Sequence, residues 1–316
     1  MNTTALFFLL GVGLLALGGD LVVRGASGFA LAAGLSRLVV GLTVVGAGTS
    51  APELAVCIQA ALDGRGGIAI GNVVGSNIAN ILLILGAAAV VRPFSVPRAA
   101  VRRDLPIAIG ATLLLITLAM DGSLTRKDGA VLVLVLVAEL AYTVREERKA
   151  ALANPTITFI RNGRETLAQV GITVAGLGLL VLGARWVVMG AVAGARALGW
   201  SELVIGLTVV AVGTSLPELV ASSASALRGQ GGLAVGNVFG SNIFNFLGVL
   251  GVTLLASPSP LPVERSTILV DLPIALAAVV LCIPILGRGL RIGRVEGGAL
   301  LSCFVVYTLL TLGAFR

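Results

Sequence analysis

The sequence predicts an all-α membrane protein with ten transmembrane helices, arranged as two inverted repeats of five helices. The composition and an internal repeat predict this fold. Of the 316 residues, 57% are hydrophobic and only 12% are charged, and the mean hydropathy is +1.05. A soluble domain carries about 25% charged residues. The chain is therefore expected to fold in a lipid bilayer.

The ten spans follow from the breaks between apolar stretches. A helix that crosses a bilayer needs about 20 apolar residues, and charged or Gly/Pro-rich segments divide the chain into stretches of that size. The first stretch is interpreted as a span, because it lacks the positive segment and the clear cleavage site of a signal peptide. The predicted spans are residues 4–22, 36–62, 67–91, 104–120, 127–144, 166–188, 201–227, 232–256, 269–286 and 296–314.

The positive charges indicate the orientation in the membrane. The net charge is +7, but the cations lie between spans and form no basic face, so we expect no nucleic-acid partner. Cytoplasmic loops of inner-membrane proteins are rich in Lys and Arg, which predicts a cytoplasmic location for one group of cations and an extracytoplasmic location for both termini. This group consists of Arg24, Arg37, Arg92, Arg98, Arg102, Arg103, Arg145, Arg148, Lys149, Arg161, Arg164, Arg228, Arg288, Arg291 and Arg294.

The internal repeat covers both halves of the chain. Residues 34–54 align without gaps with residues 199–219, and residues 66–86 align with residues 231–251, both at an offset of 165. The segment Asp104-Leu105-Pro106-Ile107-Ala108 matches Asp271-Leu272-Pro273-Ile274-Ala275 after a slip of two residues. Five spans per half is an odd number, so the second copy enters the membrane from the opposite side, as in many transporters. We expect repeats at 1–150 and 166–316, joined by a cytoplasmic linker at 151–165.

The second span of each repeat carries a G-T-S-x-P-E-L motif that should interrupt the helix. Pro52 and Pro217 lack an N–H, and a proline ring clashes with the carbonyl four residues earlier. Carbonyls around Gly48 and Gly213 are therefore expected to lose their helical partners. At membrane depth such groups must be satisfied again. A bound cation is one way to do so.

The same motif places a glutamate near the middle of each span. Glu53 and Glu218 have no Lys, Arg or His nearby in these spans, and an ionised carboxylate there is costly unless it is paired or coordinated. Two carboxylates with hydroxyl and carbonyl oxygens suit hard cations such as Ca²⁺ and Na⁺. The alternative is a protonated glutamate that is only hydrogen-bonded.

The third span of each repeat adds polar residues at every fourth position, which places them on one helical face. These residues are Asn72, Ser76 and Asn80 in the first repeat and Asn237, Ser241 and Asn245 in the second. Glycines form an adjoining ridge that permits close helix packing: Gly67, Gly71, Gly75, Gly232, Gly236 and Gly240. Packing explains the glycines, whereas the polar residues are predicted to line an ion site.

Other features are interpreted as structural. Asp104 and Asp271, each followed two residues later by proline, resemble helix N-caps. Glu139 is expected to reach the cytoplasmic interface. Cys57, Cys282 and Cys303 fall inside predicted spans. They are interpreted as packing residues without a disulfide framework.

These motifs resemble the cation/Ca²⁺ exchanger superfamily, in particular the prokaryotic Na⁺/Ca²⁺ exchanger-like proteins with α-1 and α-2 repeats. The likeness rests on GTSAPEL with GNVVGSNIAN and on GTSLPEL with GNVFGSNIFN, in the order of the family. It places the α-1 motif at 41–86 and the α-2 motif at 206–251. It implies the Na⁺/Ca²⁺ exchanger fold, in which the first and sixth spans slide over a core of the other eight.

The resemblance also implies the ligands of each ion. Ca²⁺ would bind Glu53 and Glu218 with the backbone carbonyls of Thr49 and Thr214. Na⁺ would use these residues together with Ser50, Ser76, Ser215, Ser241 and the carbonyls of Gly46 and Ala211, in a site lined by Asn72, Asn80, Asn237, Asn245, Pro52 and Pro217. Some relatives, including K⁺-dependent ones, carry Asp at the position of Asn245, so this chain resembles the K⁺-independent pattern.

The resulting hypothesis is a secondary antiporter in the cell inner membrane that exchanges Na⁺ for Ca²⁺. It is not an enzyme, and it needs no cofactor, nucleic acid or obligate protein partner beyond the lipid bilayer. The first alternative is a Ca²⁺/H⁺ or other divalent cation/proton antiporter in which the same glutamates carry H⁺. An ion channel would show conductance far above carrier turnover. An intramembrane hydrolase has little support, because the sequence contains no His and no Gly-x-Ser-x-Gly motif.

Overall fold

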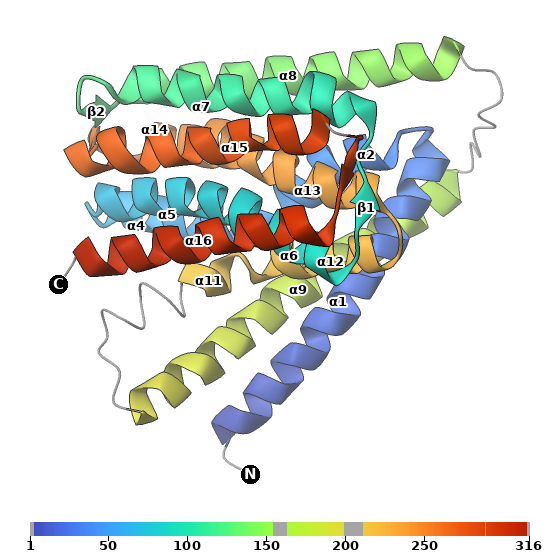
Figure 1. The fold of residues 1–316 in the computed structure, drawn as a ribbon, viewed down its shortest axis with the longest axis horizontal. Coiled ribbons are helices and arrows are strands. Elements are labelled where there is room, and N and C mark those ends of the chain that lie inside the picture. The colour runs from blue at the N-terminus through green and yellow to red at the C-terminus, as the bar shows by residue number, and fades with distance from the viewer. Residues whose placement is uncertain (1–2, 154–162, 199–210, 288, 315–316) are drawn as a thin grey trace.

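The computed structural model describes residues 3–153, 163–198, 211–287 and 289–314. Apart from four two-residue strands, its elements are helices, of which most run roughly parallel in one bundle, while α1 and α9 slant away from it side by side (Figure 1). The α-helices are α1 (Thr3–Ala33), α2 (Arg37–Val40), α3 (Gly46–Thr49), α4 (Ala51–Leu62), α5 (Gly66–Ala79), α6 (Gly86–Val91), α7 (Leu105–Ala119), α8 (Arg126–Ala153), α9 (Gly163–Ala197), α11 (Ala211–Thr214), α12 (Leu216–Leu227), α13 (Gly231–Ile243), α14 (Leu250–Ala256), α15 (Leu272–Gly287) and α16 (Arg294–Ala314).

Several of these α-helices continue into one another through single π-helical turns. Such turns are rare and occur often at functional sites. The π-helical turns are Gly41–Val45, Ala100–Asp104, Asn80–Leu85, Phe244–Val249 and Thr267–Asp271. Six of the described helices are long and apolar enough to cross a membrane, and the bent pair Arg37–Thr49 and Ala51–Leu62 adds a seventh. The start of the predicted span 201–227, residues 206–210 of the α-2 motif, Arg161, Arg288 and most of the predicted linker lie outside the described residues.

Two short antiparallel ladders join the repeats and show that they are inverted. Strand β1 (Phe94–Ser95) pairs with β4 (Arg291–Ile292), and β2 (Ser123–Leu124) pairs with β3 (Leu261–Pro262). Strand β1 precedes α7 and β2 follows it. In the second repeat, β3 precedes the equivalent helix α15 and β4 follows it. Each ladder therefore pairs the start of a helix in one repeat with the end of its equivalent in the other, which requires opposite directions through the bundle.

Helices α1 and α9 pack closely along a ridge of glycines spaced seven residues apart. A Cβ on Gly18 would lie 2.8 Å from the backbone nitrogen of Leu180 and 2.9 Å from the carbonyl oxygen of Gly176. The ridge consists of Gly11, Gly18 and Gly25 on α1 and of Gly176, Gly183 and Gly190 on α9, and a Cβ on each would lie less than 3.0 Å from an atom of the facing helix. Small residues that let backbones meet are a main source of helix association in membranes. The two helices therefore form one tight pair.

Both helices are longer than the predicted spans 4–22 and 166–188. Asp20 and Arg24 form an ion pair of 2.7 Å one turn apart, and α1 continues past them to Ala33, before Gly34, where φ is +65°. Two polar contacts also tie α1 to the end of α12: Arg228 pairs with Asp20, and Ser27 Oγ donates to Gln230 Oε1.

Replacing Gly18 by alanine should loosen this pair. The added methyl group would meet backbone atoms, which cannot rotate away, and overpacking typically costs about 1–3 kcal/mol. We expect a lower unfolding temperature for Gly18→Ala in detergent. The matched control is Gly13→Ala on the same helix, where a Cβ meets nothing within 4 Å. Equal unfolding temperatures for the two variants would mean that the close approach at Gly18 does not stabilise the fold.

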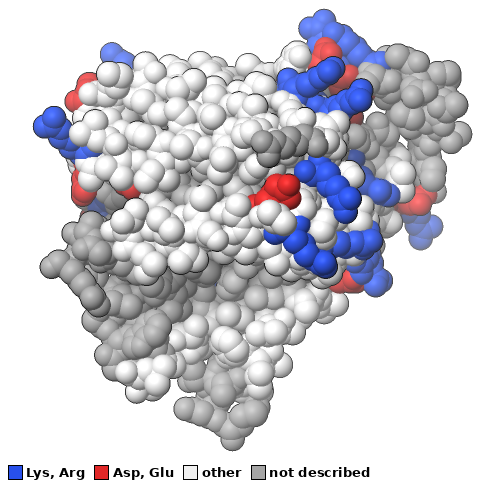
Figure 2. Space-filling view, viewed as in Figure 1, with Lys and Arg blue, Asp and Glu red and all other residues white. Residues whose placement is uncertain are grey.

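Most of the positive side chains in view in Figure 2 gather at one end of that face, beyond a broad surface without charged residues, and a few lie at the opposite end. Two of them are held by helix ends: Arg92 Nη1 donates to the carbonyl oxygen of Leu227, and Arg294 Nε donates to that of Val90 at 3.2 Å. Favourable contacts of this kind between Arg and the last carbonyls of a helix are common. This clustering agrees with the predicted separation of charge between the two membrane sides.

Two structural interpretations from the sequence are wrong. Asp104 and Asp271 are not N-caps, because each ends a π-helical turn that continues directly into α7 or α15. The helix starts earlier than its proline suggests. Glu139 does not reach the interface: it is 7% exposed and accepts a hydrogen bond from Thr143 Oγ1 at 2.8 Å.

Candidate cation-binding site

Both G-T-S-x-P-E-L motifs interrupt their helices at the serine, as predicted from the prolines. Helix α3 ends before Ser50, where φ and ψ are −79° and 2°, and the axis bends by 42° into α4. Ser215 has φ and ψ of −89° and 6° between α11 and α12. Each proline lies in the first turn of the following helix, where its missing N–H costs nothing. The glutamate of each motif follows in that same turn.

Glu53 and Glu218 are the centre of the site. Each is 1% exposed, and they lie close enough to interact electrostatically with each other. Among the residues that the structure describes, neither oxygen of either carboxylate has a hydrogen-bond partner. Two buried charges of like sign without partners cannot persist in an apolar interior. They require bound cations or protons.

Further oxygens around the glutamates share this lack of partners. The buried hydroxyls of Ser50 and Ser215 and the buried amide groups of Asn80 and Asn245 accept and donate no hydrogen bond within the described part of the chain. Both asparagines lie where α5 or α13 passes into a π-helical turn. Ser76 and Ser241 are also buried. Carboxylate, hydroxyl and amide oxygens are the ligands of hard cations such as Ca²⁺ and Na⁺, so the residues fit such an ion.

The predicted carbonyl ligands sit beside the helix breaks. The carbonyl oxygen of Gly46 accepts the N–H of Ser50 at 3.1 Å and the hydroxyl of Thr49 at 3.3 Å. Both of its lone pairs are therefore engaged, and ligation by this atom requires one donor to move. Thr49 Oγ1 also lies 3.4 Å from Ser241 Oγ, which connects the two motifs. Ala211 and Thr214 are the first and last residues of α11.

Asn72 and Asn237 lie behind the glutamates and hold the neighbouring helices. Asn237 Nδ2 donates to the backbone oxygen of Glu218 at 3.3 Å and to Ser222 Oγ at 2.9 Å, while its Oδ1 accepts from Thr49 Oγ1 at 3.2 Å. Asn72 Nδ2 donates to Cys57 Sγ at 3.3 Å. Cys57 and Ser222 are equivalent at the offset of 165. Asn237 thus ties the turn that carries Glu218 to α13, and Asn72 ties α5 to α4 one turn after Glu53.

The sequence pattern missed the pair Asn77 and Asn242. Asn77 Nδ2 donates to the carbonyl oxygen of Asn242 at 3.1 Å, and Asn242 Nδ2 donates to that of Asn77 at 3.3 Å. The two residues are equivalent in the repeats, so this reciprocal pair lies on the pseudo-twofold axis and joins α5 to α13. The G-S-N triplet present in both copies was the available signal, but these asparagines fall outside the four-residue spacing.

The glycine ridge of the second repeat brings α13 against the first repeat. A Cβ on Gly236 would lie 2.3 Å from the carbonyl oxygen of Leu38, and one on Gly240 would lie 2.3 Å from that of Leu42. The predicted close approach is confirmed here. For the ridge at Gly67, Gly71 and Gly75, the equivalent partners at the offset of 165 lie within 199–210, outside the described residues.

A many-helix membrane protein in which two inverted repeats bring unpaired carboxylates and hydroxyls together between broken helices is, by class, a secondary cation transporter. The comparison with known proteins narrows this class. The chain belongs to the sodium/calcium exchanger protein family, whose sequence profile matches residues 3–145 and 168–313. It is therefore a multi-pass membrane antiporter of cations and not an enzyme.

Individual relatives match over nearly the full length. The chain is 39% identical over 315 residues to the putative antiporter CaxA of Alkalimonas amylolytica, covering 97% of this chain and 98% of CaxA. It is 40% identical over 268 residues to the inner membrane protein YrbG of Escherichia coli, covering 79% and 81% of the two chains. Its fold is similar to that of the sodium-calcium exchanger NCX_Mj soaked with Na⁺ and Sr²⁺, with a TM-score of 0.84 at 32% identity and coverage of 96% and 97%. This likeness confirms the predicted exchanger fold, from which about ten spans are inferred.

Proposed function

We propose that this protein exchanges Na⁺ for Ca²⁺ across the cytoplasmic membrane by alternating access and without K⁺. The observation that supports this most is the pair of buried glutamates without protein partners, Glu53 and Glu218. Ca²⁺ binds their carboxylates and the carbonyls of Thr49 and Thr214. Na⁺ uses the same residues with the motif serines and the carbonyls of Gly46 and Ala211.

The charge of the site enforces exchange. Two carboxylates carry −2, which Ca²⁺ or two Na⁺ neutralise, and a third Na⁺ leaves +1. An empty site must carry both negative charges through an occluded state, at a cost of several kcal/mol for each uncompensated ion. Loaded forms therefore cross readily and the empty form does not. K⁺ independence rests on Asn245, a neutral amide at a position where an acid would add a further negative charge.

The moving part is the α1–α9 pair. Its two helices contact each other far more than they contact the remaining bundle, and Figure 1 shows them slanting away from it. The ion pair of Arg228 with Asp20 and the Ser27–Gln230 hydrogen bond hold the pair at its Arg-rich end. We assign this end to the cytoplasm, with the linker 151–165 on the same side. Of the relatives, YrbG is an inner membrane protein.

A flux assay in proteoliposomes tests this function. With pH clamped, an outward Na⁺ gradient should drive Ca²⁺ uptake, and the rate should be the same with and without K⁺. Uptake that needs a pH gradient and no Na⁺ would establish Ca²⁺/H⁺ exchange by the same glutamates instead. Conductance without a counter-ion would indicate a channel.

A further inference from the structure

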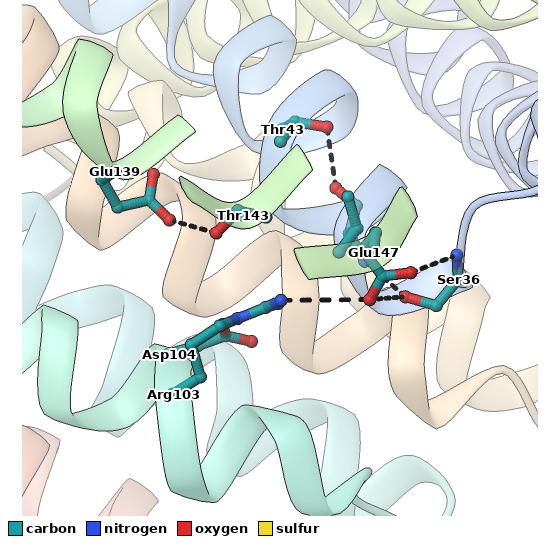
Figure 3. A network of polar contacts seen from close by, with 8 residues as sticks. Ser36, Thr43, Arg103, Asp104, Glu139, Thr143 and Glu147 are labelled. Carbon is teal, nitrogen blue, oxygen red and sulfur yellow. Dashed lines mark hydrogen bonds and ion pairs between the residues drawn. The ribbon is translucent and has the colours of Figure 1, made fainter. Parts of the chain in front are cut away.

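A second buried acidic cluster lies apart from the glutamate pair, between α7 and α8. Asp104 at the start of α7 is fully buried and accepts Arg103 Nε at 2.6 Å. Glu139 on α8 is 7% exposed and accepts the hydroxyl of Thr143. Figure 3 shows these residues with Glu147, whose Oε1 lies 3.9 Å from Arg103 Nη1. The cluster thus contains three carboxylates and one arginine.

Two oxygens of this cluster have no partner in the described chain. Asp104 Oδ2 and Glu139 Oε2 are buried without a hydrogen bond, and Glu139 interacts electrostatically with Asp104 and Arg103. Glu139 also borders an apolar cavity of about 430 Å³, whose other walls include Ile107, Leu114, Val135 and Leu247. Arg103 and Asp104 already neutralise each other. An ionised Glu139 would therefore add an unbalanced negative charge beside this apolar surface. Such a charge is costly.

The second repeat has a neutral group at the equivalent position. Asp271 is the equivalent of Asp104, and α8 and α16 correspond from Arg126 and Arg294 onward. On this alignment Tyr307 is the equivalent of Glu139. Tyr307 Oη donates to Asp271 Oδ1 at 3.3 Å. A neutral O–H donor therefore stands beside the aspartate in the second repeat.

The alignment extends one helical turn further. Thr143 of α8 corresponds to Thr311 of α16. Each threonine lies one turn after the compared position, Glu139 or Tyr307. Thr143 donates to the Glu139 side chain, whereas Thr311 donates to the backbone oxygen of Tyr307 at 2.9 Å. The two positions thus share the threonine, whereas the aspartates differ: Asp104 is paired with Arg103, and Asp271 follows Val270.

We propose that Glu139 is a proton-binding site: it is a protonated carboxylic acid, neutral like the phenol of Tyr307 at the equivalent position of the second repeat. The titratable and charged groups around it are Arg103 and Asp104 from the start of α7 and Tyr142 and Glu147 from α8. Arg103 is the only cation among them; its Nε and Nη1 face Asp104 and Glu147, and its Nη2 has no partner in the described chain. The proton on Glu139 removes the charge that no partner balances.

The proton is coupled to the segment that leads from α1 into α2. Glu147 accepts both the N–H and the hydroxyl of Ser36 at 3.1 Å, and it shares Arg103 with Asp104. Loss of the proton from Glu139 leaves a new negative charge that attracts Arg103 away from Glu147. The connection at Ser36 is then weakened. Proton sensitivity can therefore arise here without any change at Glu53 or Glu218.

Infrared spectroscopy tests the proton directly. In saturating Ca²⁺, which fixes the state of the cation site, the Glu139→Gln variant should lose one carbonyl band of a protonated carboxylic acid. Glu147→Gln in the same cluster should keep that band, because Glu147 is held as an acceptor by Ser36. An unchanged band in Glu139→Gln would overturn the proposal. Glu139→Tyr, which copies the second repeat and has the adjoining cavity for its ring, should lose the band as Glu139→Gln does.

The coupling has its own readout, which rests on the proposed exchange activity. Wild-type exchange should fall on the alkaline side as Glu139 loses its proton, and Glu139→Gln should lack this fall. An identical alkaline decline in both proteins would overturn the coupling, and it would leave the infrared result to decide on the proton site. Because the infrared band requires no transport, failure of the proposed function is distinguishable from failure of the proton site.

Discussion

Replacing either site glutamate by glutamine should abolish Na⁺-driven Ca²⁺ uptake while the protein remains folded in the membrane. Glu53→Gln and Glu218→Gln each keep the shape of the side chain but remove one of two negative charges. The remaining charge cannot balance Ca²⁺. Mutation of a residue that only hydrogen-bonds to a metal ligand lowers metal affinity or activity about 10–100-fold. Loss of the charge of a ligand itself should therefore lower uptake by more than about 100-fold. Uptake into proteoliposomes is the measurement.

The variants should still fold, because each substitution removes the energetic cost of a buried, unpaired charge. In both variants a buried charge that has no protein partner becomes a neutral amide. The unfolding temperature without Ca²⁺ should therefore stay the same or rise, and the stabilisation that added Ca²⁺ gives the wild type should disappear. Glu146→Gln, an exposed acid on α8 that pairs with Lys149, is the matched control. Ca²⁺ uptake retained in either site variant would place the ion elsewhere.

The sequence predicted those parts of the site that depend on local chemistry. A proline after a run of small residues favours a helix break, and the structure has both breaks at Ser50 and Ser215. The alignment of two copies then predicted a shared site, because inverted repeats meet at their symmetry axis.

Contacts made to backbone atoms and between distant segments could not be predicted in this way. Asn77 and Asn242 bind each other's carbonyl oxygens, and a carbonyl carries no residue-specific signal. Glu139 resembles an interfacial acid in its own helix, because the arginine and aspartate that surround it come from a segment more than thirty positions earlier. A carboxylate in a span can be interpreted only when the neighbouring helix is known.

The length of α1 was underestimated for a related reason. Charged residues inside an apolar stretch usually mark the end of a span, and the predicted first span ends at residue 22, between Asp20 and Arg24. In the structure the two side chains neutralise each other one turn apart, and Arg228 from α12 joins them. Pairing within and between helices thus lets a helix carry charge beyond the expected boundary.

The second large effect is expected at Gly240, where α13 crosses the first repeat beside the site. An alanine Cβ there would lie 2.3 Å from the carbonyl oxygen and 2.6 Å from the Cα of Leu42. Both are backbone atoms, so α13 must shift to accommodate the methyl group. Overpacking of this kind costs about 3 kcal/mol or more when the neighbour cannot yield. The Gly240→Ala variant should unfold at a clearly lower temperature in detergent.

The shift should also damage exchange, because Ser241 follows Gly240 directly and contacts Thr49 across the repeat boundary. Gly298→Ala on α16 is the matched control, since its Cβ meets nothing within 4 Å and alanine favours a helix by about 1 kcal/mol over glycine. This control should be as stable and active as the wild type. Gly240→Ala could instead match Gly298→Ala in both unfolding temperature and exchange activity. That result would mean that α13 can shift away from Leu42 at no cost, and that the geometry of the cation site does not depend on this contact.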